Sequence, residues 1–134
     1  MLIKSTGRVI YDPPRPGMRK VRPGSFLIAE VDNSIAEYYR WWVKKRFGLI
    51  LQNTAWKPHI TVLDGRQRLS QEQMKLWKKY QGQIITFEYS VDIEQQWKFW
   101  CLPVKSIALD NIREEFGLES RKPFPFHITI GRME

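Results

Sequence analysis

The two histidines of this 134-residue chain each stand two positions before a threonine. His59 and Thr61 lie in the run Lys-Pro-His-Ile-Thr-Val, and His127 and Thr129 lie in the run Pro-Phe-His-Ile-Thr-Ile. Serine and threonine fill only 12 of the 134 positions, so composition alone gives this double spacing a probability below about 0.01. The two runs therefore indicate a functional pair more strongly than two half-buried strand histidines with hydroxyl neighbours.

Paired imidazoles are suited to opening a phosphodiester. One histidine takes a proton from water or a ribose 2′-hydroxyl, and the other protonates the departing oxygen; an unperturbed pKa of about 6.5 allows both tasks near neutral pH. The sequence does not assign which histidine is the base and which is the acid. The hydroxyls of Thr61 and Thr129 would hold the non-bridging phosphate oxygens, so we predict that His59, Thr61, His127 and Thr129 are the catalytic residues.

Alternation along a strand must position these groups. Side chains at positions i and i+2 of a strand point to the same face, so His59 projects with Thr61 and His127 projects with Thr129. The isoleucine between each pair would pack behind it. Two such strands facing one another would form a cradle for one phosphate.

Seven further residues are candidates for binding the substrate. Arg132 follows the second motif and Lys57 precedes the first, so either cation could reach the phosphate. The rings that could stack on a base are those of Tyr11, Trp56, Trp97, Trp100 and Phe124, although each ring could equally belong to the core. Trp56 and Phe124 are preferred because they lie close to the two motifs.

The two H-x-T motifs, 68 positions apart, resemble those of the 2H phosphoesterase superfamily. The final run His-Ile-Thr-Ile-Gly-Arg is similar to the second motif of its RNA ligase-like cyclic phosphodiesterases. This resemblance implies an α+β fold with two pseudo-symmetric antiparallel sheet lobes, helices on the outside and a central cleft. It also implies that no metal or other cofactor is required.

The resemblance further implies a hydrolase that acts on a 2′,3′-cyclic phosphate or on a cyclic oligonucleotide, since some phage members cleave the cyclic oligonucleotide signals of bacterial defence. A nucleotide or RNA is the expected partner. The alternative is a non-catalytic module that binds or sequesters RNA or nucleotides in the same cleft. A scaffold protein that docks a partner through a proline- and arginine-rich arm is a third possibility.

Composition agrees with a nucleotide partner. A net charge of +8 and a pI near 9.8 favour phosphate-bearing ligands. Cys101 is the single cysteine, which excludes an internal disulfide and a four-cysteine zinc site, and no H-E-x-x-H pattern accompanies the histidines. We see no signal peptide or membrane span, so the sequence predicts a cytoplasmic protein, acting in the host cytoplasm if it is encoded by a phage, with no membrane or obligate protein partner.

The pattern along the chain predicts one α+β domain over residues 1–134, with mostly antiparallel strands. Residues 11–24 hold four prolines and four basic side chains, which indicates an extended arm that either packs as a surface loop or clamps a polyanion. Strands are expected at 25–31, 49–52, 58–63, 84–90, 96–104 and 126–130, and helices at 35–47, 70–80 and 106–116.

Overall fold

The computed structural model describes residues 1–14, 17, 22–54, 56–66, 68–119 and 124–133. Most of the proline-rich arm, residues 15–16 and 18–21, thus lies outside the described residues. The elements in chain order are β1 (Leu2–Tyr11), β2 (Leu27–Val31), α1 (Asn33–Phe47), β3 (His59–Leu63), α2 (Gln71–Met74), β4 (Ile84–Ser90), β5 (Glu94–Gln96), β6 (Phe99–Lys105), α3 (Ile107–Glu115) and β7 (Phe126–Arg132).

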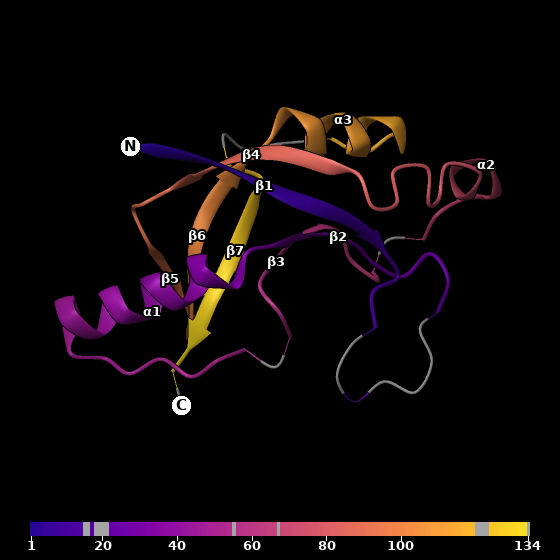
Figure 1. The fold of residues 1–134 in the computed structure, drawn as a ribbon. Helices are drawn as coiled ribbons and strands as arrows, with labels where there is room; N and C mark the ends of the chain where they lie inside the picture. Colours follow the sequence, from indigo (N-terminus) through magenta and orange to yellow (C-terminus); the bar gives the residue numbers. More distant parts are fainter. Residues whose placement is uncertain (15–16, 18–21, 55, 67, 120–123, 134) are drawn as a thin grey trace.

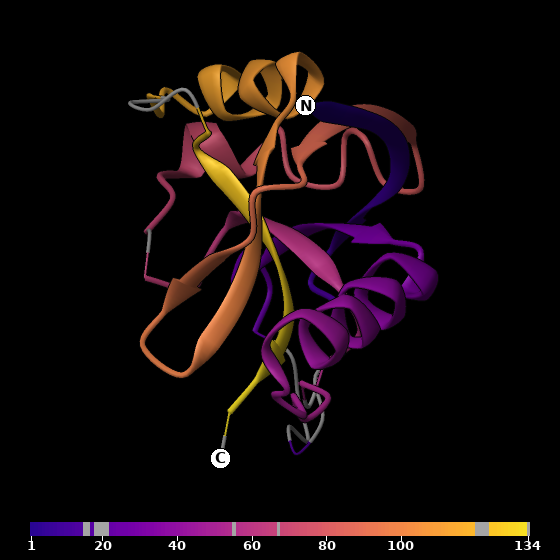
Figure 2. The same cartoon turned by 90° about the vertical axis from the view of Figure 1, so that its left-hand side faces the viewer.

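The strands form one antiparallel sheet that closes on itself. Their order is β4-β1-β2-β3-β7-β6-β5, and an additional pairing of β4 with β6 joins the two sides into a six-stranded barrel, with β5 attached to β6 as a hairpin arm. Helices α3 and α1 lie on opposite sides of the strands (Figure 1 and Figure 2). The α+β class is confirmed, whereas two separate sheet lobes are not found: every named strand belongs to one sheet.

The order of elements repeats once along the chain. The first half runs β1, β2, α1, β3, and the second runs β4, β6, α3, β7, with the short β5 inserted. Neighbouring strands pair antiparallel in the same way in both halves. The halves meet through β3 with β7 and through β1 with β4, so each half contributes one H-x-T strand to a shared seam.

Strand alternation builds the core on the inner face of the barrel. Ile60, Ile128 and Leu102 are fully buried there, together with Val9 and Ala29 from the first half. Burial of these aliphatic side chains supplies the main driving force for folding, at about 25 cal/mol per Å² of apolar surface removed from water. The motif residues on either side of Ile60 and Ile128 consequently point the other way, out of the barrel wall.

Both long helices lie within two residues of their predicted bounds, 35–47 and 106–116. Asp32 caps α1 by accepting a hydrogen bond from the Ser34 N–H, and Gly48 ends the helix in a left-handed conformation with φ of 69°. Ser106 caps α3 in the same manner through the Leu109 N–H. In the described part of the chain, no helix is long and apolar enough to cross a bilayer.

Four expectations about the elements are wrong. Residues 49–52 form no strand, and only Gln52 makes an isolated bridge, to Arg132. The helix expected over 70–80 ends at Met74 because the chain then turns, with Lys78 at a φ of 67°. The long strand β1 has no counterpart among the predicted elements. The strand expected over 96–104 is divided by a turn at Trp97 and Lys98, so that Gln96 ends β5 and β6 begins at Phe99.

Candidate active site

The seam between β3 and β7 brings the two motifs together. Ile60 pairs with Ile128 in antiparallel register, and extending this register by one residue in each direction sets His59 opposite Thr129 and Thr61 opposite His127. We call these four residues, His59, Thr61, His127 and Thr129, the HxT quartet. Because both central isoleucines are fully buried, all four side chains of the quartet lie on the solvent side of the barrel wall.

The quartet has two-fold symmetry, with each imidazole beside the hydroxyl of the other motif. The two histidines are diagonal neighbours, a relation that separates side chains on adjacent strands by roughly 7–8 Å. That spacing leaves room for one tetrahedral phosphate between the rings. Each threonine can then donate its hydroxyl hydrogen to an oxygen of the same group.

His59 is held in a defined orientation. Its Nδ1 lies 2.7 Å from the Lys57 carbonyl oxygen. Since a carbonyl only accepts hydrogen bonds, Nδ1 carries a hydrogen, and Nε2 is the nitrogen that gains or loses a proton. The Trp56 ring packs at 4.2 Å between centroids and contacts Phe26 on its other side, which restricts rotation of the imidazole.

His127 has different surroundings. Its side chain reaches solvent at the edge of a cleft, yet the neighbouring protein removes part of its hydration, and this desolvation lowers its pKa. The carboxylate of Glu94, on the hairpin strand β5, acts in the opposite direction by favouring the charged imidazolium. The neutral form of His127 is therefore favoured near neutral pH.

The cleft beside His127 has a volume of about 690 Å³. Thr61 and His127 line its quartet end, and Asp64, Arg113 and Glu119 add charged groups further along. Arg113 projects from α3 and donates from Nη1 to the Val62 carbonyl at 2.6 Å. The Arg113 side chain therefore both supports β3 and lines the cleft. No sequence pattern within α3 predicts this role.

The other flank of the quartet is covered by β6. The sulfur of Cys101 lies 3.7 Å from the Thr129 hydroxyl oxygen, and Cys101 is paired in register with both Thr129 and Glu94. Burial raises the pKa of the Cys101 thiol, so the neutral thiol persists at neutral pH. Cys101 thus packs beside the site as a weak hydrogen-bonding neighbour.

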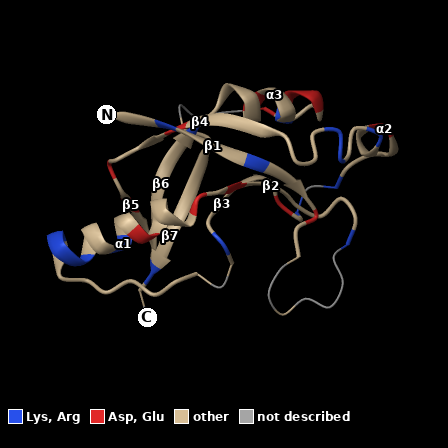
Figure 3. Cartoon of the chain, in the orientation of Figure 1, with Lys and Arg blue, Asp and Glu red and all other residues tan. Residues whose placement is uncertain are grey.

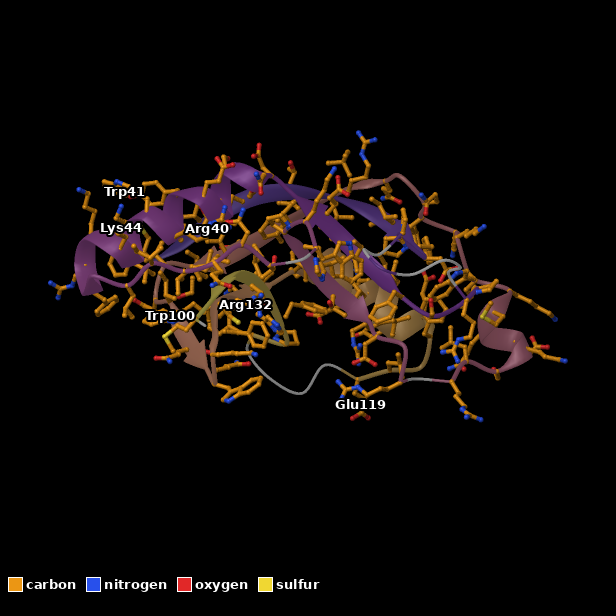
Figure 4. All side chains as sticks on the ribbon, turned by 90° about the horizontal axis from the view of Figure 1, so that it is seen from below. Arg40, Trp41, Lys44, Trp100, Glu119 and Arg132 are labelled. Atoms are coloured by element: carbon orange, nitrogen blue, oxygen red, sulfur yellow. The ribbon has the colours of Figure 1, made fainter. Side chains whose placement is uncertain are left out.

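Arg132 reaches the quartet face because β7 is irregular. Simple alternation would turn residue 132 away from Thr129, but the register shifts between Trp100 and Cys101, so that Phe99 pairs with Arg132 while Cys101 pairs with Thr129. Arg132 consequently shares the face of Phe99 and Cys101. Figure 4 shows Arg132 near Trp100 and well apart from Glu119.

The remaining predicted binding residues differ in outcome. Trp56 packs on His59, and Lys57 contributes its carbonyl to His59 while its side chain stays exposed. Phe124 is exposed and stands next to Pro125 in the wall of the cleft. The prediction that Tyr11 binds the substrate is wrong. Tyr11 is the last residue of β1, is only 4% exposed and packs its ring against Trp77, so it is not available to a ligand.

Among the described residues, no group of three His, Cys, Asp or Glu side chains gathers in a way that could hold a metal ion. Comparisons with family models, curated proteins and solved structures found no match for this chain.

Proposed function

We propose that this protein is a metal-independent phosphodiesterase that hydrolyses a ribonucleotide phosphodiester, either a 2′,3′-cyclic phosphate or a linkage within a cyclic oligonucleotide. The observation that carries the proposal is the register of the β3–β7 seam, which brings two imidazoles and two hydroxyls to one face. Few side-chain sets other than two histidines can supply both a base and an acid near pH 7 without a large pKa shift.

In the proposed reaction His127 is the base and His59 is the acid. The lowered pKa of His127 keeps its imidazole neutral, so it can take a proton from water or from a ribose 2′-hydroxyl. The freed oxygen attacks phosphorus, and the bond to the leaving oxygen breaks as Nε2 of His59 delivers a proton to it. One proton enters the histidine pair and one leaves it, and Thr61 and Thr129 donate hydrogen bonds to the non-bridging oxygens.

The relation to the 2H phosphoesterases is part of this proposal. It is supported by the two H-x-T runs and by the repeated strand-strand-helix-strand order of the chain. Each half supplies one run to the seam, as a bilobal ancestor with two similar halves would require. The closed barrel then corresponds to the two lobes joined along both the β3–β7 and the β1–β4 contacts.

A substrate panel tests the proposed activity. The purified chain is incubated, with EDTA present, with 2′,3′-cyclic mononucleotides, RNA ending in a cyclic phosphate, and 3′,5′-linked cyclic di- and trinucleotides, and the products are separated by chromatography. We expect hydrolysis of at least one class, and a loss of about 10²–10⁴-fold in turnover for His59→Ala and for His127→Ala.

Circular dichroism and thermal melting of both variants provide the control, because neither side chain belongs to the core. Binding of the panel without turnover by the wild-type chain would contradict the proposal and would favour a nucleotide-sequestering module. Unchanged turnover in either folded variant would equally refute it.

A further inference from the structure

The tip of the β5–β6 hairpin carries a tryptophan where the backbone favours glycine. Trp97 and Lys98 form a two-residue loop between Gln96 and Phe99, which pair with one another. Trp97 takes a φ of 56°, whereas Lys98 is not among the described residues with positive φ. A positive φ at the first loop residue is usual in two-residue hairpin turns. Glycine is a common residue at that position, and a bulky side chain there is strained.

Trp97 does not compensate for this strain by burial. Its side chain is 77% exposed, and it touches the Phe99 ring with centroids 6.1 Å apart. The ammonium of Lys98 lies 4.6 Å from the centre of the indole ring, and Gln95 donates a hydrogen bond to the Trp97 carbonyl. A strained and exposed aromatic held by its neighbours is the kind of outlier from which a functional role is inferred.

The hairpin continues the face of the quartet. From Thr129 the register leads to Cys101, then two residues along β6 to Phe99, whose neighbour across the strand is Arg132. With a rise of about 3.4 Å per strand residue and the 6.1 Å ring contact, Trp97 lies beyond Phe99 and at most about 13 Å from Cys101. In Figure 2 this hairpin extends away from the barrel beside β7.

We infer that Trp97 is a stacking subsite for a base of a single-stranded oligonucleotide whose phosphodiester lies in the HxT quartet. The ring lies at the hairpin tip, beyond Cys101 and Phe99 as seen from the quartet, so it would meet the base of a nucleotide next to the one whose phosphate reacts. Arg132, paired with Phe99, and Lys98, beside the Trp97 ring, supply positive charge for the intervening backbone, and aromatic faces accept any base. This inference rests on the proposed function and narrows its substrate to a chain or ring of several nucleotides.

A linear strand and a cyclic oligonucleotide both present a row of bases on a ribose-phosphate backbone. Separate linear and cyclic probes distinguish which of the two the subsite binds. Binding is measured by fluorescence anisotropy with a labelled 2′-O-methyl octauridylate, in which the 2′-hydroxyl is blocked, and by competition with a 3′,5′-linked cyclic triadenylate. Turnover is measured with 2′,3′-cyclic uridine monophosphate.

We expect Trp97→Ala to weaken binding of the linear strand by about 10-fold, within the range for loss of one base–aromatic stack, and to leave turnover of the cyclic mononucleotide unchanged. Equal weakening for the cyclic triadenylate assigns the subsite to rings as well as strands. Trp41→Ala is the matched control, because Trp41 is also exposed, at 52%, but lies on α1 away from the hairpin (Figure 4). It should bind both probes as the wild type does.

Folding is checked with Trp97→Gly, which should bind as poorly as Trp97→Ala while melting at a temperature about 3 °C higher than the wild type, because glycine relieves the turn. Wild-type affinity in Trp97→Ala, or a loss equal to that of Trp41→Ala, would overturn the inference. Weakened binding in Trp97→Ala together with no turnover of any phosphodiester by the wild type would refute the proposed function alone and leave the subsite standing.

Discussion

The two histidines of the quartet sit in near-identical sequence motifs but have different surroundings. His59 is oriented by the Lys57 carbonyl and by the Trp56 ring, whereas His127 stands at the edge of the cleft with a lowered pKa. Because the folded pKa of His127 lies below its unfolded value of about 6.5, protons favour the unfolded chain. Stability should therefore fall as the pH drops below about 6.5 and on through the lowered folded pKa of His127.

Removing the charge of Glu94 tests this electrostatic account. The Glu94 carboxylate raises the pKa of His127, so Glu94→Gln should lower that pKa further and move the acidic limb of activity to lower pH. Titration of the imidazole carbon-bound protons by NMR measures the shift without any substrate. Since the chain has two histidines, the spectrum of His59→Ala assigns the His127 signal. A pKa that is unchanged or raised in Glu94→Gln would contradict the account.

The helices hold the motif strands at equivalent points. Arg40 of α1 donates to the carbonyl of Ile130, three residues after His127, and Arg113 of α3 donates to the carbonyl of Val62, three residues after His59. Each helix thus secures the motif strand of the opposite half. Gly131 permits the close approach on the α1 side, since a Cβ there would lie 2.9 Å from the Leu51 Cβ and 3.3 Å from Arg40.

Loss of one such contact should destabilise the barrel. Arg113→Met leaves the Val62 carbonyl without its charged donor, so we expect the free energy of unfolding to fall by about 1.5–3 kcal/mol. Urea denaturation followed by tryptophan fluorescence measures the change. Lys75→Met is the control, because Lys75 pairs with Glu72 on the exposed surface of α2 and should cost less than about 1 kcal/mol. Equal losses in the two variants would argue against a structural role for Arg113.

Local pattern was sufficient to predict most of the elements and the quartet. The capping residues of α1 and α3 mark these helices in the sequence. Strand alternation alone predicts that His59 and Thr61 share a face. The sequence did not predict strand β1 because its middle, Lys4 to Arg8, is polar. Backbone hydrogen bonds to β2 and to β4 on its two sides stabilise this strand. Tertiary contacts of this kind leave no periodic signal in the sequence.

The rest of the site depends on contacts between distant residues. Glu94 and Arg113 reach the quartet only through the β5–β6 hairpin and the packing of α3 on β3. Arg132 lies on the face of the quartet because of a register shift between β6 and β7, which the sequence does not reveal. Tyr11 is buried in the core because β1 extends as far as this residue. The strain at Trp97 is likewise a property of the folded hairpin.

The whole molecule is needed to complete one site. Neither half contains more than one histidine, and the closed order of the strands brings the halves together at the seam. The net charge of +8 is spread over the surface, with a basic cluster at the C-terminal end of α1 (Figure 3). General attraction of polyanions is thus expected of the whole surface, whereas the proposed bond cleavage is assigned to the seam.

Turnover by the double variant His59→Ala/His127→Ala, measured beside both single variants on whichever phosphodiester the wild type cleaves, tests the central claim most directly. If the two imidazoles act as a unit on one phosphorus, the double variant should lose no more than about the larger of the two single losses, because either deletion already abolishes the concerted proton transfers. Losses that multiply in the double variant, or undiminished turnover in either single variant, would contradict the account.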